Sequence, residues 1–407
     1  MSSNAKSLTF EDLEGAVTGT AAAFRCVLGL APAGGADDKI FPPTYAGAEY
    51  AKEKRRIRDG EGKEREVNCV LLDSVQSQAN RMEEALLEAV LAERFQLPVI
   101  EVDFTEANKT LRKPVNNVTS LQAPHRLADA ILRDSVCPDG TSFRDSDHAK
   151  RWRAANARNA TPIYELCPTA LVFGLWGSPE KPGGLGAKFE RTIVSEIVAV
   201  DCLVVEKRSG FRIDPLEIRS AVRVIPGEGG GFTVRDDPNA KGSVAPSEIN
   251  HGNIVFDSAN AGVRCRFAEQ TTVLSLAALR RLCFPMKDGK SDPKADGAAR
   301  IVLAAIALCG ATLASERGLN LRSRCLLVPT ETRIWEILDG PGKDPRKVSV
   351  DAETAVSVVK QAVQAAKKVG LTWREERLVL KPSPELVRLV KESQERATKE
   401  SGEGAAA

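Results

Sequence analysis

The stretch that most restricts the fold of this chain runs from Arg191 to Val205 and reads RTIVSEIVAVDCLVV. β-branched residues are frequent in it, and they favour strands because their side chains pack well on a pleated surface. The run therefore predicts a long strand. Shorter apolar runs predict further strands, at residues 21–31, 168–176, 263–274 and 321–329.

Helical patterns alternate with these strands. The clearest covers residues 74–95, where apolar side chains recur every three or four positions. Its first two turns carry four polar residues on the opposite side, namely Gln76, Ser77, Asn80 and Arg81. Unpaired N–H groups at a helix N-terminus favour anions, so this is either an anion-binding face or an ordinary solvated face. Further helices are expected at residues 275–283, 298–315 and 352–369.

The composition is that of an ordinary globular protein. The 407 residues are 43% hydrophobic and 28% charged, with a net charge of +2. Residues 298–314 are the most apolar stretch, but Arg300 and Gly310 interrupt it, so we expect a buried helix and not a membrane span. The N-terminus lacks the pattern of a signal peptide, which predicts a cytoplasmic location. The nine cysteines include no CxxC pair, which predicts free thiols in place of a zinc site.

A glycine-rich loop in the middle of the chain is followed at once by basic residues. Gly183, Gly184 and Gly186 precede Lys188, Phe189 and Arg191. Neither a P-loop nor a Rossmann loop matches, because both the spacing of the glycines and the residues after them differ. Glycines let the backbone approach an anion closely, and the two cations add charge. The loop therefore predicts contact with a nucleic-acid phosphate backbone, held without much base stacking because aromatic residues are only 5% of the chain.

Recognisable catalytic motifs are missing from the sequence. It contains no G-x-S-x-G elbow, no H-E-x-x-H, and no histidine beside a plausible nucleophile. Asp37 and Asp38 are adjacent in a glycine-rich loop, where turn formation is favoured over metal binding or acid–base chemistry. We therefore expect no catalytic residue, no metal site and no cofactor.

Five segments together resemble one family. They are LLDSVQSQANRMEEALL (71–87), PTALVFGLWGSPEKPGGLGAKFERTIVSEIVAVD (168–201), SEINHGNI (247–254), VLSLAALRRLCF (273–284) and AARIVLAAIALCGATLASERGLNLRSRCLLV (298–328). Over most of the chain, and in this order, they resemble the CRISPR-associated RAMP proteins of the type I-G (formerly I-U) systems.

The resemblance implies an α+β fold with a modified RRM-like, ferredoxin-type palm and inserted finger and thumb regions. The palm would comprise residues 1–205 and 251–330. The basic segment 137–160 would be the finger, and a β-rich insertion at 206–250 would be the thumb. The remaining residues would form a helical C-terminal elaboration (331–398) and a disordered tail (399–407).

The resemblance also implies a non-catalytic backbone subunit of a Cascade surveillance complex. Copies would polymerise head to tail along one CRISPR guide RNA, beside other Cascade subunits, and present its bases for pairing with target DNA. The RNA contacts that it implies are Gln76, Ser77, Asn80, Arg81, Gly183, Gly184, Gly186, Lys188, Phe189 and Arg191. Asn250 and His251 would lie where the thumb returns to the palm.

Two other functions stay open on the sequence. A RAMP-type endoribonuclease would process CRISPR RNA, with His251 as the candidate base, or would cut target RNA through Asp37 or Asp38. A metabolic enzyme would instead bind a phosphorylated small molecule at the glycine-rich loop. No catalytic constellation accompanies that loop, which disfavours the second alternative.

Overall fold

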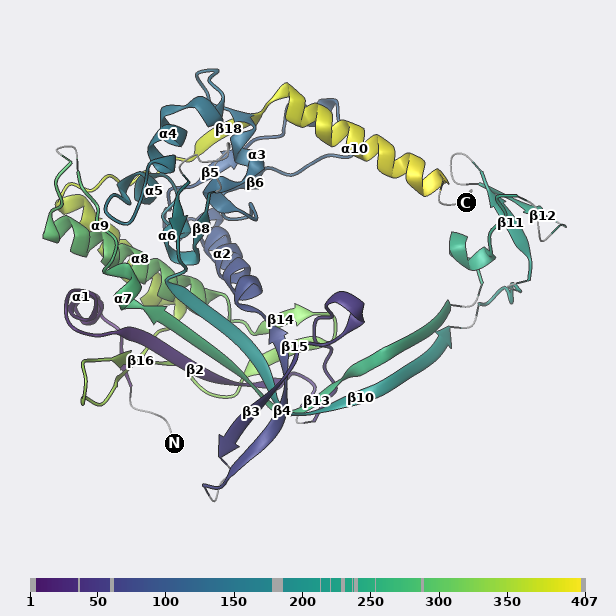
Figure 1. Cartoon of the computed structure of the whole chain (residues 1–407), viewed down its shortest axis with the longest axis horizontal. Coiled ribbons are helices and arrows are strands. Elements are labelled where there is room, and N and C mark those ends of the chain that lie inside the picture. Colours follow the sequence, from purple (N-terminus) through teal and green to yellow (C-terminus); the bar gives the residue numbers. More distant parts are fainter. Residues whose placement is uncertain are drawn as a thin grey trace. The chain divides into compact units, whose positions relative to one another are not determined.

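The computed structural model describes residues 5–35, 37–58, 62–177, 186–212, 214–219, 221–227, 231–235, 237, 241–252, 254–286 and 289–403. These residues form an α+β protein, which confirms the expected fold class (Figure 1). The chain divides into two compact units. Unit 1 comprises residues 1–103, 117–203 and 263–383, and unit 2 comprises residues 104–116, 204–262 and 384–407.

The main sheet has the strand order β1-β17-β16-β2-β13-β10-β4-β3, and β15 also pairs with β2 and with β14. The strands are Lys6–Ser7 (β1), Ala23–Pro32 (β2), Lys52–Arg58 (β3), Glu64–Asp73 (β4), Ile193–Arg212 (β10), Ile254–Ser275 (β13), Leu319–Arg322 (β14), Cys325–Pro329 (β15), Ile334–Leu338 (β16) and Arg346–Ser349 (β17). The β-branched run of the sequence is thus confirmed as a strand, β10, near the middle of the sheet.

Part of this sheet has the connectivity of a ferredoxin-like fold. Along the chain β2 is followed by helix α2 (Val75–Leu91), then by β10 and β13, helix α8 (Pro293–Leu313), and finally β15 and β16. In the sheet the order is β15 or β16, β2, β13, β10, which is the 4-1-3-2 order of a βαββαβ unit. Strands β13, β15 and β16 all pair with β2 in antiparallel register.

Helix α8 is the centre of the helical layer in unit 1. It contacts α1 (Phe10–Thr18), α2, α6 (Thr169–Phe173) and α9 (Ala352–Lys368). Within the described residues it is the one helix long and apolar enough to cross a membrane, and 83% of its most apolar window is buried inside the protein. Such burial is typical of a core helix, as expected from the interrupted apolar stretch. Eight of the nine cysteines are buried and the ninth is half-buried, and all nine are free thiols, as expected.

A smaller sheet with the order β6-β5-β18-β7 completes unit 1. Its strands are Ile100–Val102 (β5), Val118–Thr119 (β6), Ser135–Val136 (β7) and Leu378–Pro382 (β18). Short helices follow β6 and β7 along the chain, namely Ala130–Arg133 (α3), Asp147–Arg153 (α4) and Thr161–Leu166 (α5). Another short helix, Leu276–Leu279 (α7), follows β13 and contacts α8 and β2. The basic segment 137–160 therefore packs within unit 1, with Trp152 buried.

Unit 2 contains a β-hairpin of its own. Strands β11 (Arg223–Pro226) and β12 (Phe232–Arg235) pair in antiparallel register, and Val224 also bridges to Val244. The insertion expected at residues 206–250 falls within the 204–262 segment of this unit. Helix α10 (Pro384–Glu403) also belongs to unit 2.

Three expectations need correction. Residues 168–176 are not one strand but the buried helix α6 followed by β8 (Leu175–Trp176), because short apolar runs do not distinguish buried helix from strand. Residues 331–398 are not a purely helical elaboration, since β16 and β17 lie in the main sheet. Residues 399–403 of the expected disordered tail continue α10, while residues 404–407 lie outside the described part.

Candidate nucleic-acid interface

Two short strands of unit 1 flank the glycine-rich loop. Strand β8 pairs with β9 (Lys188–Phe189) in antiparallel register, so that Leu175 faces Phe189 and Trp176 faces Lys188. Gly183 and Gly184 lie outside the described residues, and Gly186 is described and exposed. The Trp176 side chain is 68% exposed, and Lys188 Nζ lies 4.2 Å from the centre of its ring. An aromatic ring and a cation are thus presented together at the base of this loop.

Arg191 lies in a pocket of about 530 Å3 beside this hairpin, which we call the Arg191 pocket. Its wall includes Gln76 from α2, Arg126, Trp176 and Phe189. Arg191 donates one hydrogen bond to the Phe173 carbonyl oxygen (3.1 Å) and another to Gln76 Oε1. Both partners are uncharged. Among the described residues, no carboxylate oxygen lies within 4.0 Å of Arg191 or of Lys188.

Arg126, in the wall of the Arg191 pocket, forms a buried ion pair with Glu83. Arg126 donates two hydrogen bonds to the Glu83 carboxylate (2.6 and 2.7 Å) and a third to the Gly174 carbonyl oxygen (3.2 Å). Burial raises the pKa of Glu83 to about 7, although Arg126 opposes that shift. Burial and the nearby charge of Arg126 both lower the pKa of Arg191. The charge of Glu83 opposes this shift, but no described carboxylate oxygen lies within 4.0 Å of Arg191.

Lys188 also lines a second, smaller pocket of about 240 Å3, which we call the Lys188 pocket. Phe189 and Glu190 line both this pocket and the Arg191 pocket, so the two adjoin along strand β9. Arg281 contributes a further cation and donates a 2.8 Å hydrogen bond to Glu190, in an exposed pair. We call these two adjoining pockets together the groove; Arg126, Lys188, Arg191 and Arg281 are the basic residues in its described wall.

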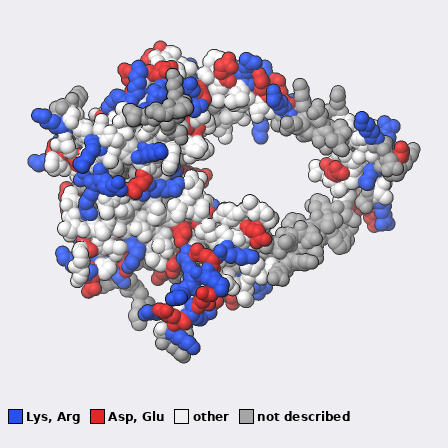
Figure 2. All heavy atoms as spheres, in the orientation of Figure 1, with Lys and Arg blue, Asp and Glu red and all other residues white. Residues whose placement is uncertain are grey.

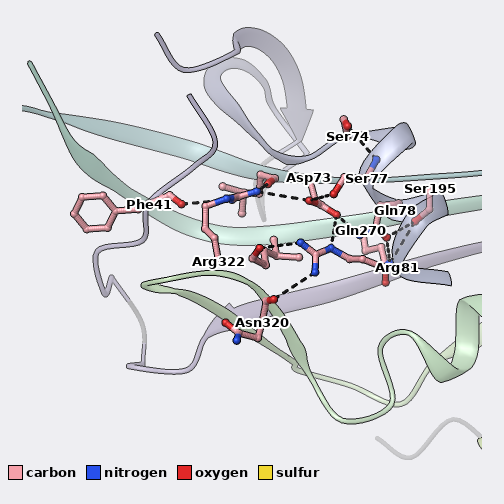
Figure 3. Close-up of polar contacts among 12 residues, drawn as sticks. Phe41, Asp73, Ser74, Ser77, Gln78, Arg81, Ser195, Gln270, Asn320 and Arg322 are labelled. Atoms are coloured by element: carbon pink, nitrogen blue, oxygen red, sulfur yellow. Dashed lines mark hydrogen bonds and ion pairs between the residues drawn. The ribbon is translucent and has the colours of Figure 1, made fainter. Parts of the chain in front are cut away.

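The four polar residues at the start of α2 fall into two groups, two that are exposed and two that bind a buried carboxylate. Gln76 and Asn80 are exposed, and Gln76 lines the Arg191 pocket. Ser77 and Arg81 instead bind Asp73, which ends β4 and is 1% exposed. Figure 3 shows both side chains directed at the Asp73 carboxylate.

The Asp73 carboxylate holds several segments of unit 1 together. It accepts hydrogen bonds from Ser77 Oγ (2.8 Å), Gln78 Nε2 (2.6 Å) and Arg81 Nε (3.0 Å). Arg322 Nη2 lies 3.6 Å from Asp73 Oδ1. The two arginines also reach main-chain oxygens, those of Asn320 and Leu321 for Arg81, and those of Phe41 and Leu72 for Arg322. Arg81 thus has a structural role that its sequence position did not reveal.

Gln78 extends this network into the sheet (Figure 3). Its Oε1 accepts hydrogen bonds from Ser195 Oγ of β10 (3.0 Å) and from Gln270 Nε2 of β13 (2.7 Å). All three side chains are buried. A polar serine within the apolar run of β10 was the one sequence signal for this network.

Asn250 and His251 belong to unit 2, whereas the other described site residues belong to unit 1. Asn250 follows a 3-10 turn at Pro246–Ile249 and has φ of 63°. His251 donates its backbone N–H to the Pro246 carbonyl oxygen (2.8 Å), and its ring packs edge-on against Phe232 at 5.4 Å. These contacts account for both residues as parts of a packed turn.

Asp37 and Asp38 occupy a turn after β2. Asp37 has φ of 60°, and Asp38 accepts a hydrogen bond from the Lys39 backbone N–H (2.7 Å). In the described part of the chain, no group of three histidine, cysteine, aspartate or glutamate residues is placed to hold a metal ion.

Gly174 fixes the position of Arg191. It has φ of 89° and ψ of 150°, a conformation that only glycine adopts readily. A Cβ added there would lie 2.9 Å from Arg191 Cγ.

We expect Gly174→Ala to lower the free energy of unfolding by about 1–3 kcal/mol and to lower the affinity for any ligand that Arg191 binds. Gly15→Ala is the matched control, because Gly15 lies within α1 with no atom within 4 Å of an added Cβ, and we expect that variant to be slightly more stable. Equal stability of both variants in urea unfolding would contradict this account.

Three groove residues were missed by sequence reasoning, namely Arg126, Trp176 and Arg281. The tryptophan directly before the glycine-rich loop was the available signal. Arg126 and Arg281 come from distant segments that only the fold brings to the groove.

Residues 25–204 match the family model of CRISPR-associated protein GSU0053. This range contains most of β2, all of α2, β8 and β9, and the first half of β10, and therefore most of the groove. No curated protein matches the chain. Over these 180 of its 407 residues the chain is similar to a CRISPR-associated family.

Proposed function

We propose that this chain is a non-catalytic RNA-binding subunit of a CRISPR complex, and that the groove holds the phosphate backbone of the guide RNA. The observation that carries the proposal is the pair of cations Lys188 and Arg191, which line adjoining pockets without a carboxylate partner among the described residues. A half-buried guanidinium without a counter-ion favours an anionic ligand, and arginine binds phosphate through two parallel hydrogen bonds.

The neutral side chains of the groove support an RNA ligand. The Gln76 amide and the exposed Asn80 amide can exchange hydrogen bonds with ribose hydroxyls, which distinguish RNA from DNA. Ser77 and Arg81 are not among the proposed contacts, because Asp73 already binds both side chains. Gly186 would bring its backbone N–H group to a phosphate.

Trp176 adds a stacking surface to this groove. Its exposed ring would receive one base, with Lys188 beside it on the adjacent phosphate. We expect Trp176→Ala to weaken RNA binding by about 1–3 kcal/mol, the usual contribution of one stacked base, and Trp176→Phe to retain most of the affinity. Tyr45→Ala serves as the control, since Tyr45 is exposed and lines none of these pockets. Wild-type affinity in Trp176→Ala, measured by fluorescence anisotropy, would remove Trp176 from the interface.

The assembly is part of the same proposal. Copies of the chain would bind one guide RNA head to tail, within a type I-G Cascade complex in the cytoplasm, and leave bases free to pair with target DNA. Asp37 and Asp38 would then only shape their turn, and His251 would only pack against Phe232.

RNA binding by the purified protein tests the proposal. We expect similar affinities for RNAs of unrelated sequence, and affinity that falls steeply with salt, because phosphate contacts release counter-ions but carry no sequence information. Strong preference for one hairpin together with a defined cleavage product would instead establish the endoribonuclease alternative.

A further inference from the structure

Unit 1 contains a third and larger pocket, with a volume of about 1090 Å3, between α5 and residues 370–374. Three arginines line it, namely Arg151, Arg158 and Arg374, and Glu165 is the one acidic residue in its described wall. Exposed amide and hydroxyl groups are also present, at Asn159 and Thr372. We call it the three-arginine pocket.

Only one of these arginines has a described acidic partner. Arg151 donates a 2.7 Å hydrogen bond to Glu165, whereas Arg158 and Arg374 have no carboxylate within 4.0 Å among the described residues. The neighbouring His148 responds to the resulting positive charge. Burial lowers its pKa, and the charges of Arg374 and Arg151 lower it further. The described wall of the pocket therefore carries an excess of positive charge.

The three-arginine pocket and the Lys188 pocket are lined by adjacent residues of the chain. Ala157 lines the Lys188 pocket and the next residue, Arg158, lines the three-arginine pocket. Backbone hydrogen bonds join the wall between them, from Cys283 N–H to the Ala157 carbonyl oxygen (2.8 Å) and from Ala160 N–H to the Cys283 carbonyl oxygen (2.9 Å). Figure 2 shows Lys and Arg side chains gathered on this face over α5 and α6, with few acidic side chains among them.

We propose that the three-arginine pocket is a second binding site for the phosphodiester backbone of a nucleic acid, in line with the groove at Lys188 and Arg191. The inference rests on the proposed function, because it extends the same groove. A single phosphate would fill little of a pocket of this volume. A polyanion that passes through all three pockets would meet Arg191, Lys188, Arg158 and Arg374, none of which has a described carboxylate within 4.0 Å. The acidic residues in the described walls, Glu190 and Glu165, pair with Arg281 and Arg151 instead.

The test compares RNAs of two lengths on a double variant, Arg158→Ala with Arg374→Ala. An RNA of about 6 nucleotides fills only the groove at Lys188 and Arg191, while one of about 30 nucleotides reaches further. We expect the double variant to bind the long RNA at least about tenfold more weakly and to leave the short RNA unaffected. The salt dependence for the long RNA should also decrease, by about 0.7 for each phosphate that the variant no longer neutralises. Lys347→Ala with Lys360→Ala removes the same charge from exposed positions outside the three pockets and should change neither affinity.

A second experiment, in which RNA-loaded protein binds complementary DNA, shows whether the pocket holds phosphates of the RNA or of the DNA strand. If the Arg158→Ala, Arg374→Ala variant binds both RNAs normally but its RNA-loaded form binds complementary DNA at least about tenfold more weakly, the pocket holds phosphates of the DNA strand. Unchanged affinity in both arms would overturn the inference. The proposed function fails separately, if Lys188→Ala with Arg191→Ala leaves binding of the short RNA unchanged.

Discussion

Replacing Lys188 and Arg191 together with alanine is expected to weaken RNA binding by about 100-fold or more. A hydrogen bond to a charged group contributes about 1.5–3 kcal/mol, and both cations line the groove without a described carboxylate partner. The loss should be about equal for RNAs of unrelated sequence, because phosphate contacts do not read bases. The fold should be retained, since Arg191 donates only to the Phe173 carbonyl oxygen and to the exposed Gln76, and neither cation forms an ion pair with a described acidic residue.

Fluorescence anisotropy at several salt concentrations measures this effect. Because the variant should neutralise two fewer phosphates, the slope of log affinity against log salt should fall by about 1.4 for a single strand. The Lys347→Ala, Lys360→Ala protein controls for net charge. Affinity within about threefold of wild type for the groove variant, or a loss confined to one RNA sequence, would show that these cations do not bind phosphate.

Asp73→Ala is expected to lower the free energy of unfolding by about 3–5 kcal/mol, because it removes the buried carboxylate that two half-buried arginines and two neutral side chains share. Asp73 is 1% exposed. Its carboxylate accepts hydrogen bonds from Ser77, Gln78 and Arg81, and Arg322 lies 3.6 Å away from it. Its loss would release α2 from the β14 segment that Arg81 reaches through main-chain oxygens.

Urea unfolding of the variant tests the structural role of Asp73. Asp147→Ala is the matched control, since Asp147 is 93% exposed in its pair with Lys150 and should change stability by no more than about 0.5 kcal/mol. Asp73→Asn should lie between the two, because the amide retains an acceptor but loses the charge. Two results together would contradict this account: Asp73→Ala changes the free energy of unfolding little, and Arg81→Ala lowers RNA affinity strongly without a change in stability. Arg81 would then be an RNA contact.

The long elements of the fold were predictable because their patterns are local. The apolar stripe of α2 and the β-branched run of β10 both appear as expected. Helix α6 was mistaken for a strand because five buried apolar or small residues show no period that separates the two. The strands β16 and β17 were missed because strands more than 300 residues away in the chain stabilise them. Strand β16 pairs with β2, and β17 pairs with β1 and with β16.

The candidate site was predictable only in part, for a related reason. Sequence shows which side chains are basic, but the partner that neutralises each one often comes from another segment. Arg81 and Arg191 look alike in the sequence, yet Asp73 binds Arg81 while Arg191 meets only neutral oxygens in the described structure. Arg322, which completes the Asp73 network, lies about 250 residues further along the chain.

Purification of the tagged chain from cells that carry a matching CRISPR array, and from cells without one, tests the central claim most directly. Mass measurement and nucleic-acid analysis of the product decide the result. The account predicts a large particle with several copies of the chain on one intact guide RNA, formed only when the array is present. A monomer free of RNA from both kinds of cell would contradict it.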